Sequence, residues 1–257
     1  MILGHYHGPM LEPVAKGPSI AFFGGSFDPP HRGHLAVAHA AQAALDLDTV
    51  LFAPVGAQPL KPLGSTASFE DRVAMTRLAI ANEPRFALSL ADAPKKNDAS
   101  KHTPDHTPNY TFDTLVALKR DLPPYSELFC LLGADSFLTL KHWHRGAEIP
   151  FIAPLIVASR PGQNLADLAE ALPAGLSLEP CFSSPVAAVE LRTCTLRNAS
   201  GATAPFHLLP GLHIDISATA IREEVQSEVA RIPAGEGHHS DLPDAVFDYI
   251  AAHNLYR

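Results

Sequence analysis

The chain has 257 residues, of which 46% are hydrophobic and 18% charged, and its formal net charge is −8. The composition is typical of a globular protein, and the acidic balance argues against a non-specific nucleic-acid binder, which needs a basic face. No apolar run reaches the length of a membrane span. The three cysteines show no metal-type spacing, so we expect reduced thiols and a cytoplasmic protein with no membrane or nucleic-acid partner.

Residues 1–19 have no basic segment followed by a long apolar run, and glycine and proline interrupt them. We therefore expect a flexible N-terminal extension rather than a signal peptide. The remainder, residues 20–257, shows no internal repeat and no linker, so it is expected to form a single domain.

The most informative stretch is residues 20–34, IAFFGGSFDPPHRGH. Its apolar start and its two glycines predict a buried parallel strand and a tight turn, and the helix formers of residues 36–45 predict a helix after the prolines. His31 and His34 then stand at the helix N-terminus, whose free N–H groups favour phosphate. The spacing matches neither the P-loop nor the dinucleotide fingerprint. It predicts a different kind of nucleotide-phosphate site, although capping or solvated histidines are the alternative.

A strand over residues 49–53 completes a βαβ unit, which implies a parallel sheet. Lys61 follows at the carboxyl end of this strand, where open α/β sheets bind ligands, so it is expected to reach a phosphate. A helix is expected over residues 68–82. Its Arg72 either points to a phosphate or pairs with an acid such as Glu70.

The rest of the chain continues the alternation of strands and helices. Strands are expected at residues 86–90, 127–132, 154–158 and 213–217, and helices at 110–120, 137–143, 218–230 and 243–253. Residues 94–108 form a polar loop in this interpretation, and residues 163–210 form an irregular insertion of loops and short strands. The pattern predicts an α/β fold with a doubly wound parallel sheet and a C-terminal helical portion. Several polar turns fall at the carboxyl ends of strands and therefore meet at one edge of the sheet.

Five segments together resemble the bacterial nicotinate-nucleotide adenylyltransferases of the HxGH nucleotidyltransferase superfamily. They are residues 24–34, 109–115, 133–136 together with Trp143, 160–162 and 216–222. The first and last are general to the superfamily, whereas the second and third point to a pyridine nucleotide. The resemblance implies a Rossmann-like nucleotidyltransferase fold and adenylyl transfer from ATP to nicotinate mononucleotide, which yields nicotinate adenine dinucleotide and pyrophosphate in NAD biosynthesis.

The resemblance also implies roles for individual residues. His31, His34 and Arg222 are the implied catalytic residues, His31 and His34 on the ATP phosphates and Arg222 on the β- and γ-phosphates. The other implied ATP-binding residues are Gly24, Gly25, Ser26, Phe27, Gly133, Asp135, Arg160, Ser217 and Thr219. Trp143 is implied to stack on the pyridine ring. The other implied substrate-binding residues are Lys61, Arg72, Tyr110, Thr111 and His144. Mg²⁺ is expected to travel with ATP, and no protein ligand is assigned to it.

Three positions depart from the family pattern: Leu60, Asn109 and Ala218 stand where the family usually has histidine, serine and serine. The alternatives are an adenylyltransferase for nicotinamide mononucleotide or another phosphate acceptor, and a non-catalytic nucleotide-sensing protein. Trp143 is a core residue in the alternative interpretation, and Asp135 is an N-cap. The sheet edges and residues 163–210 leave a homo-oligomer open.

Overall fold

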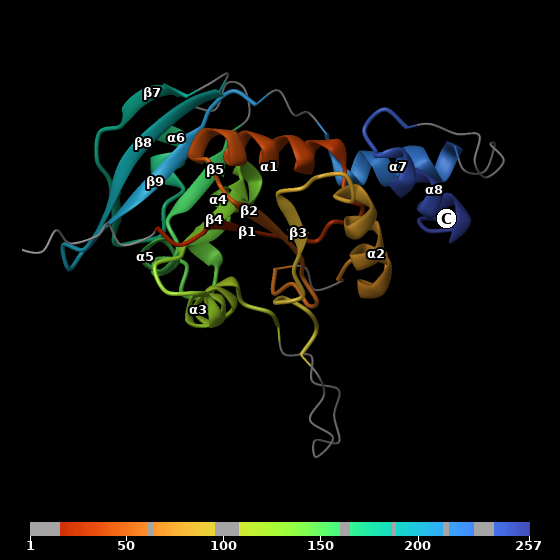
Figure 1. The fold of residues 1–257 in the computed structure, drawn as a ribbon, viewed down its shortest axis with the longest axis horizontal. Helices are drawn as coiled ribbons and strands as arrows, with labels where there is room; N and C mark the ends of the chain where they lie inside the picture. The colour runs from red at the N-terminus through yellow and green to blue at the C-terminus, as the bar shows by residue number, and fades with distance from the viewer. Residues whose placement is uncertain are drawn as a thin grey trace, which may run out of the picture.

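The computed structural model describes residues 16–60, 64–95, 108–159, 165–186, 189–212, 216–228 and 239–257. Within these ranges nine strands form one sheet (Figure 1). They are β1 (Ser19–Gly25), β2 (Thr49–Pro54), β3 (Phe86–Leu88), β4 (Glu127–Gly133), β5 (Leu155–Ala158), β6 (Leu176–Leu178), β7 (Phe182–Val186), β8 (Val189–Asn198) and β9 (Thr203–Leu209). The helices are α1 (Arg32–Leu45), α2 (Phe69–Ala79), α3 (Thr111–Asp121), α4 (Ala134–Leu138), α5 (Ile149–Ile152), α6 (Leu165–Glu170), α7 (Ala218–Glu228) and α8 (Asp244–Ala252), with a 3₁₀ turn η1 (Leu140–His142).

The strand order is β3-β2-β1-β4-β5-β9-β8-β6, and β7 also pairs with β8. The strands from β3 to β9 in this order are all parallel, whereas β8 is antiparallel to each of its neighbours. The order reverses between β1 and β4, which is the point where a doubly wound sheet opens a crevice for a ligand. The predicted doubly wound α/β fold is confirmed.

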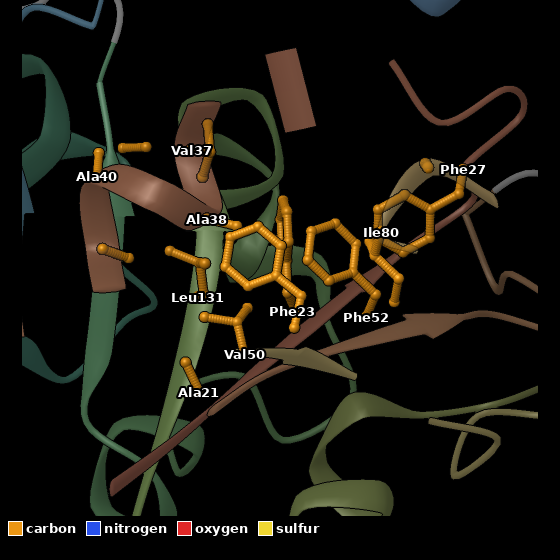
Figure 2. Close-up of a cluster of buried hydrophobic side chains, with 14 of the residues drawn as sticks. Ala21, Phe23, Phe27, Val37, Ala38, Ala40, Val50, Phe52, Ile80 and Leu131 are labelled. Carbon is orange, nitrogen blue, oxygen red and sulfur yellow. The ribbon is translucent and has the colours of Figure 1, made fainter. Parts of the chain in front are cut away.

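Helices cover both faces of the sheet because side chains alternate along each parallel strand. In β1, Ala21 and Phe23 pack towards α1, α2, α7 and α8, whereas Ile20 and Phe22 pack towards α3, α4, α5 and α6. Figure 1 shows α1 on one side of the sheet and α3 and α5 on the other. Figure 2 shows the rings of Phe23 and Phe52 in the buried cluster between the sheet and α1. Each buried phenylalanine contributes roughly 1.5–3 kcal/mol to folding.

The expected helices and strands up to residue 158 are present, except that α4 and η1 replace the single helix expected over residues 137–143, and α7 and α8 are present as well. Ser19 already belongs to β1 and is buried, so the extension expected over residues 1–19 stops short of it. Of the strand expected over residues 213–217, residues 213–215 lie outside the described residues, and Ile216 and Ser217 are not part of a strand. β9 occupies the next parallel position beside β5.

Residues 163–210, predicted to form loops and short strands, are more regular than that in the described part of the segment. It contains α6 and the strands β6, β7, β8 and β9. Along β8, Cys194 and Leu196 are buried, whereas the alternating residues Thr193 and Thr195 are only partly buried. The many Ser, Thr and Pro residues obscured this alternation, and the strands form because β8 pairs with β9 over six residue positions.

The cysteines also differ from the expectation of reduced thiols. Cys181 and Cys194 form a disulfide that ties the segment before β7 to β8. Cys130 is free and fully buried, as expected for a core residue, and burial raises the pKa of its thiol to about 12. No helix among the described residues is long and apolar enough to span a membrane.

Candidate active site

A cavity of about 900 Å³ opens at the carboxyl edge of the parallel strands. The ends of β1 and β4 form its floor, and the N-termini of α1, α3, α4 and α7 surround it. Most of the predicted site residues line this cavity: Gly24, Gly25, Ser26, Phe27, His31, His34, Tyr110, Thr111, Gly133, Asp135, Trp143, His144, Ser217, Thr219 and Arg222. Lys61 and Arg160 lie outside the described residues. The cavity is therefore built at the switch point of the sheet from segments far apart in the sequence.

The rings of the two histidines lie against each other at the start of α1, tilted by 30°. Their ring centroids are 3.7 Å apart, and the rings of Phe23 and Phe27 enclose His34 (Figure 2 shows both phenylalanines). The backbone N–H of His31 donates to Nδ1 of His34 over 3.2 Å, so the neutral ring of His34 carries its proton on Nε2. This geometry combines the helix N-terminus with an imidazole N–H donor.

Burial keeps both imidazoles neutral. It lowers the pKa of His31 to about 4, against a smaller opposing effect of Asp241. Burial also lowers the pKa of His34 well below its usual value, and the neighbouring His31 adds to this shift. Nδ1 of His31 is buried and has no hydrogen-bond partner among the described residues. An unpaired buried nitrogen is unfavourable, so the pair suits a site that a ligand completes.

Arg222 connects α7 to the loop between β1 and α1. Its Nη1 donates to the backbone carbonyl of Asp28 over 2.7 Å, and its Nη2 donates to Oγ1 of Thr219 over 3.1 Å. Ser217 precedes the first residue of α7 and accepts a long hydrogen bond, 3.5 Å, from the backbone of Ala220. Ser217 thus acts as the N-cap of α7, and the N-terminus of α7 lines the same cavity as that of α1.

Arg72 does not line the cavity, and neither role considered for it is observed. Its side chain is 2% exposed, with Nη1 donating to the carbonyl of Ser26 over 2.7 Å and Nη2 to the carbonyl of Val55 over 2.8 Å. Burial lowers the pKa of its guanidinium from the ordinary value. Arg72 therefore supports the β1–α1 loop, because its guanidinium ties the carbonyl of Ser26 to the carbonyl of Val55, just after β2.

Aromatic side chains from the start of α3 and from the segment after α4 also line the cavity. Trp143 is half-buried, packs partly on the core and also lines the cavity, and its stacking on a pyridine ring stays a prediction. Its indole Nε1 donates to Oγ1 of Thr139 over 3.0 Å. The rings of Tyr110 and His144 lie 4.5 Å apart beside the N-terminus of α3. Asp135 lies in the first turn of α4, whose N-cap is Gly133, so Asp135 is not the cap.

Several residues of the site were not assigned from sequence. Asn109, one of the departures from the family pattern, joins two loops: its Oδ1 accepts from the backbone of Ala57, and its Nδ2 donates to the carbonyl of Ala93. Asp92 is buried on the cavity wall and accepts a hydrogen bond from Thr114, and burial raises its pKa. Ser159, at the end of β5, has a buried hydroxyl without a partner among the described residues.

Asp28 is the fourth unassigned residue, and its carboxylate organises the loop before α1. Oδ2 accepts from the backbone of Thr66 over 2.6 Å, and Oδ1 accepts from the backbone of Ala67 and from the hydroxyl of Tyr256. The only local signal for this supporting role of Asp28 is its place between the two glycines at residues 24–25 and the two prolines at residues 29–30. Leu60 and Ala218, the other two departures, both line the cavity.

The cytidylyltransferase-like family model matches residues 22–224. A protein of Citrifermentans bemidjiense named "Probable nicotinate-nucleotide adenylyltransferase" is 35% identical over 237 residues, 92% of this chain and 97% of its own length. A protein of Laribacter hongkongensis with the same name is 36% identical over 93% of this chain and 94% of its own. This chain belongs to the nicotinate-nucleotide adenylyltransferase family. It is therefore a nucleotidyltransferase.

The fold agrees with this assignment. The solved structure of Plasmodium falciparum nicotinic acid mononucleotide adenylyltransferase complexed with NaAD superimposes with a TM-score of 0.57 at 18% identity, covering 93% of this chain and 97% of the other. The same enzyme complexed with APC gives a TM-score of 0.55. The family match covers both histidines and Arg222, and the relatives extend over most of the chain.

Proposed function

We propose that this protein transfers the adenylyl group of ATP to nicotinate mononucleotide, giving nicotinate adenine dinucleotide and pyrophosphate in NAD biosynthesis. The observation that carries the proposal is the shared cavity, which the His31–His34 pair, Arg222 and Trp143 all line. One cavity thus offers donors for a polyphosphate and an aromatic surface for a base. The family membership supports the same reaction.

In this reaction the phosphate oxygen of the mononucleotide attacks the α-phosphorus of ATP. The bond from that phosphorus to the bridging oxygen breaks, and the electron pair leaves with pyrophosphate. No covalent enzyme intermediate is needed, so the protein contributes orientation and charge stabilisation. His34 donates from Nε2 to the α-phosphate, where negative charge accumulates, because its Nδ1 is occupied by the backbone of His31.

The helix N-termini divide the remaining phosphate contacts. Ser217, Thr219 and Arg222 at the start of α7 suit the β- and γ-phosphates, since unpaired N–H groups and a guanidinium both favour anions. Nη1 of the Arg222 guanidinium keeps its hydrogen bond to the Asp28 carbonyl. Arg222 therefore couples the position of the leaving group to that of the histidine loop.

A preference for the acid over the amide follows from α3. Thr111 is the first residue of this eleven-residue helix, the N-cap Tyr110 makes no side-chain cap, and both residues line the cavity. The N–H groups of the first turn favour a carboxylate over a neutral amide. Trp143 is the surface on which the pyridine ring stacks in this proposal.

Mg²⁺ is proposed to enter with ATP, because this ion is usually held by substrate phosphates and few protein oxygens. Among the described residues no group of three or more His, Cys, Asp and Glu side chains is arranged to hold a metal ion, so we assign no protein ligand. The bound ion neutralises charge on the triphosphate. Asp28, the carboxylate nearest the histidine loop, is already used by Thr66, Ala67 and Tyr256.

Pyrophosphate release by the purified protein with Mg-ATP tests the proposal, with nicotinate mononucleotide and nicotinamide mononucleotide compared as acceptors. We expect fast release with the acid and little with the amide. Equal rates would replace acid specificity by dual specificity. Absence of release with either would contradict the proposal and favour another phosphate acceptor or a nucleotide sensor.

Location and assembly stay predictions. A cytoplasmic protein was expected from the cysteine count, but the Cys181–Cys194 disulfide argues against that reasoning, because such bonds are rare in the cytosol. A homo-oligomer is the other open prediction, and light scattering of the purified protein tests it. A thiol count of the protein before and after reduction tests the disulfide itself.

A further inference from the structure

Tyr256, the penultimate residue of the chain, reaches the loop that carries the histidines. Its side chain is 9% exposed, and its hydroxyl donates to Oδ1 of Asp28 over 2.8 Å, across 228 residues of sequence. The histidine pair begins three residues after Asp28. A contact between the end of the chain and the loop at its first helix is thus part of the support of the site.

The chain makes an unusual turn to place this ring. After α8 ends, Asn254 has a φ of 53° and Tyr256 a φ of 64°, both in the left-handed region that side chains other than glycine disfavour. Leu255 donates its backbone N–H to the carbonyl of Ile250, and its side chain packs on the core next to the buried ring of Tyr256. Such a conformation persists where the surroundings over-determine it, and it often accompanies a functional constraint.

Asp28 needs the Tyr256 hydroxyl because its carboxylate is 5% exposed and depends on fixed donors. Two of these donors are backbone N–H groups just before α2, and Tyr256 supplies a third. The carbonyl of Asp28 in turn accepts from Arg222. A shift of Asp28 therefore moves both the histidine loop and the contact of Arg222.

The hydroxyl keeps its proton under all ordinary conditions. Burial and the neighbouring Asp28 raise the pKa of Tyr256 above its ordinary value, whereas Arg222 and Arg72 lower it less. The phenol is thus a permanent donor to the carboxylate.

We propose that Tyr256 is a positioning residue for adenylyl transfer: its hydroxyl holds the Asp28 carboxylate, and through Asp28 it sets the spacing between His31, His34 and Arg222. Tyr256 is not among the residues that line the cavity, so it acts on the substrates through Asp28 alone. This inference rests on the proposed function, since it concerns the same reaction.

Tyr249 provides a matched control within α8. Its hydroxyl also donates to an aspartate, Oδ1 of Asp71, over 3.0 Å. Asp71 belongs to α2 and does not line the cavity. Tyr249→Phe and Tyr256→Phe therefore each remove one tyrosine–aspartate hydrogen bond from the same end of the protein, but only the second bond reaches the histidine loop.

The experiment measures pyrophosphate release by the wild-type protein, Tyr256→Phe and Tyr249→Phe, with Mg-ATP and nicotinate mononucleotide varied in turn. Loss of a hydrogen bond to a charged group lowers kcat of Tyr256→Phe by about 10-fold to 100-fold, because the transition-state donors are displaced. KM for nicotinate mononucleotide is expected to change by less than about 2-fold, as is kcat of Tyr249→Phe. Each variant is assayed well below its thermal midpoint.

A double-mutant cycle with Asp28→Asn gives a readout that a merely structural role would not move. If Tyr256 acts through Asp28, the double variant is no slower than Asp28→Asn alone. The inference would be overturned if the kcat losses of Tyr256→Phe and Asp28→Asn multiplied in the double variant. Equal losses of kcat in Tyr256→Phe and Tyr249→Phe would overturn it as well. Wild-type turnover tests the proposed function, whereas the ratio of variant to wild-type turnover tests this inference with whichever acceptor the wild-type protein uses.

Discussion

The guanidinium of Arg222 donates a hydrogen bond to the backbone carbonyl of Asp28 over 2.7 Å, joining residues 194 positions apart in the sequence. The bond connects the N-terminal turn of α7 to the loop that leads into α1. The bond therefore keeps the N-termini of α1 and α7, which both favour anions, at the lining of the same cavity.

Replacing Arg222 by lysine tests this connection. Lysine keeps the positive charge, but it is a point charge and cannot serve the Asp28 carbonyl and a phosphate at once. We expect kcat/KM for ATP to fall by about 10²-fold, as measured by steady-state pyrophosphate release. Unchanged kinetics would show that the guanidinium fork is dispensable.

His34 should be required for turnover more than for binding. In His34→Ala the Nε2 donor to the α-phosphate is lost, and kcat should fall by about 10²–10³-fold while the Kd for ATP, measured by calorimetry, changes little. His39→Ala is the matched control, because His39 lies on the exposed side of the same helix, where it pairs with Glu83. A comparable kcat loss in that control would contradict a special role for His34.

The pH dependence of stability follows from the pKa of His31, about 4 in the folded protein. In the unfolded chain a histidine titrates near 6.5, so between these values unfolding takes up a proton and acid favours it. His31 alone should lower the free energy of unfolding by about 3 kcal/mol as the pH falls from 6.5 to 4. Urea titrations at several pH values measure this loss, which should be smaller in His31→Gln. Parallel curves for the two proteins would contradict the assignment.

Trp143 should contribute to binding of the mononucleotide. Loss of a stacking surface costs about 1–3 kcal/mol per base, so Trp143→Ala should raise KM for nicotinate mononucleotide by roughly 5-fold to 150-fold and leave KM for ATP nearly unchanged. Thr139→Val removes the acceptor of the indole N–H and should raise the same KM by a smaller factor. If both KM values rise together in Trp143→Ala, the side chain is chiefly a core residue.

Arg72 should contribute to stability rather than to ATP binding. Arg72→Met removes the hydrogen bonds from the guanidinium to the carbonyls of Ser26 and Val55, and loss of a hydrogen bond to a charged group costs about 1.5–3 kcal/mol. We expect a lower thermal midpoint by calorimetry, with an unchanged KM for ATP at a temperature where the variant is folded. A raised KM without loss of stability would instead restore Arg72 to the phosphate site.

Local sequence rules determined much of this molecule. Apolar runs and glycine turns located β1, β2 and β4, and helix formers located α1, because strand and helix periods are set by neighbouring residues. The same local logic placed His31 and His34 at a helix N-terminus and Ser217 before another. These residues line one cavity because parallel strands present their carboxyl ends at a single edge.

Other features depend on partners that no local pattern names. β8 and β9 are strands because they pair with each other, and the disulfide depends on which cysteine the fold brings to Cys194. Arg72 is a buried support rather than a phosphate ligand because the carbonyls of Ser26 and Val55 lie over it.

The sequence by itself determined most elements from β1 to β5, the edge of the sheet that carries the site and the histidine pair, since these follow from short-range periodicity and capping. Only the tertiary structure decided that Asp28 receives Arg222 and Tyr256, residues 194 and 228 positions away. The physical reason is that a hydrogen bond between distant side chains depends on packing geometry. That geometry is a property of the whole fold, to which many residues contribute and which no short segment encodes.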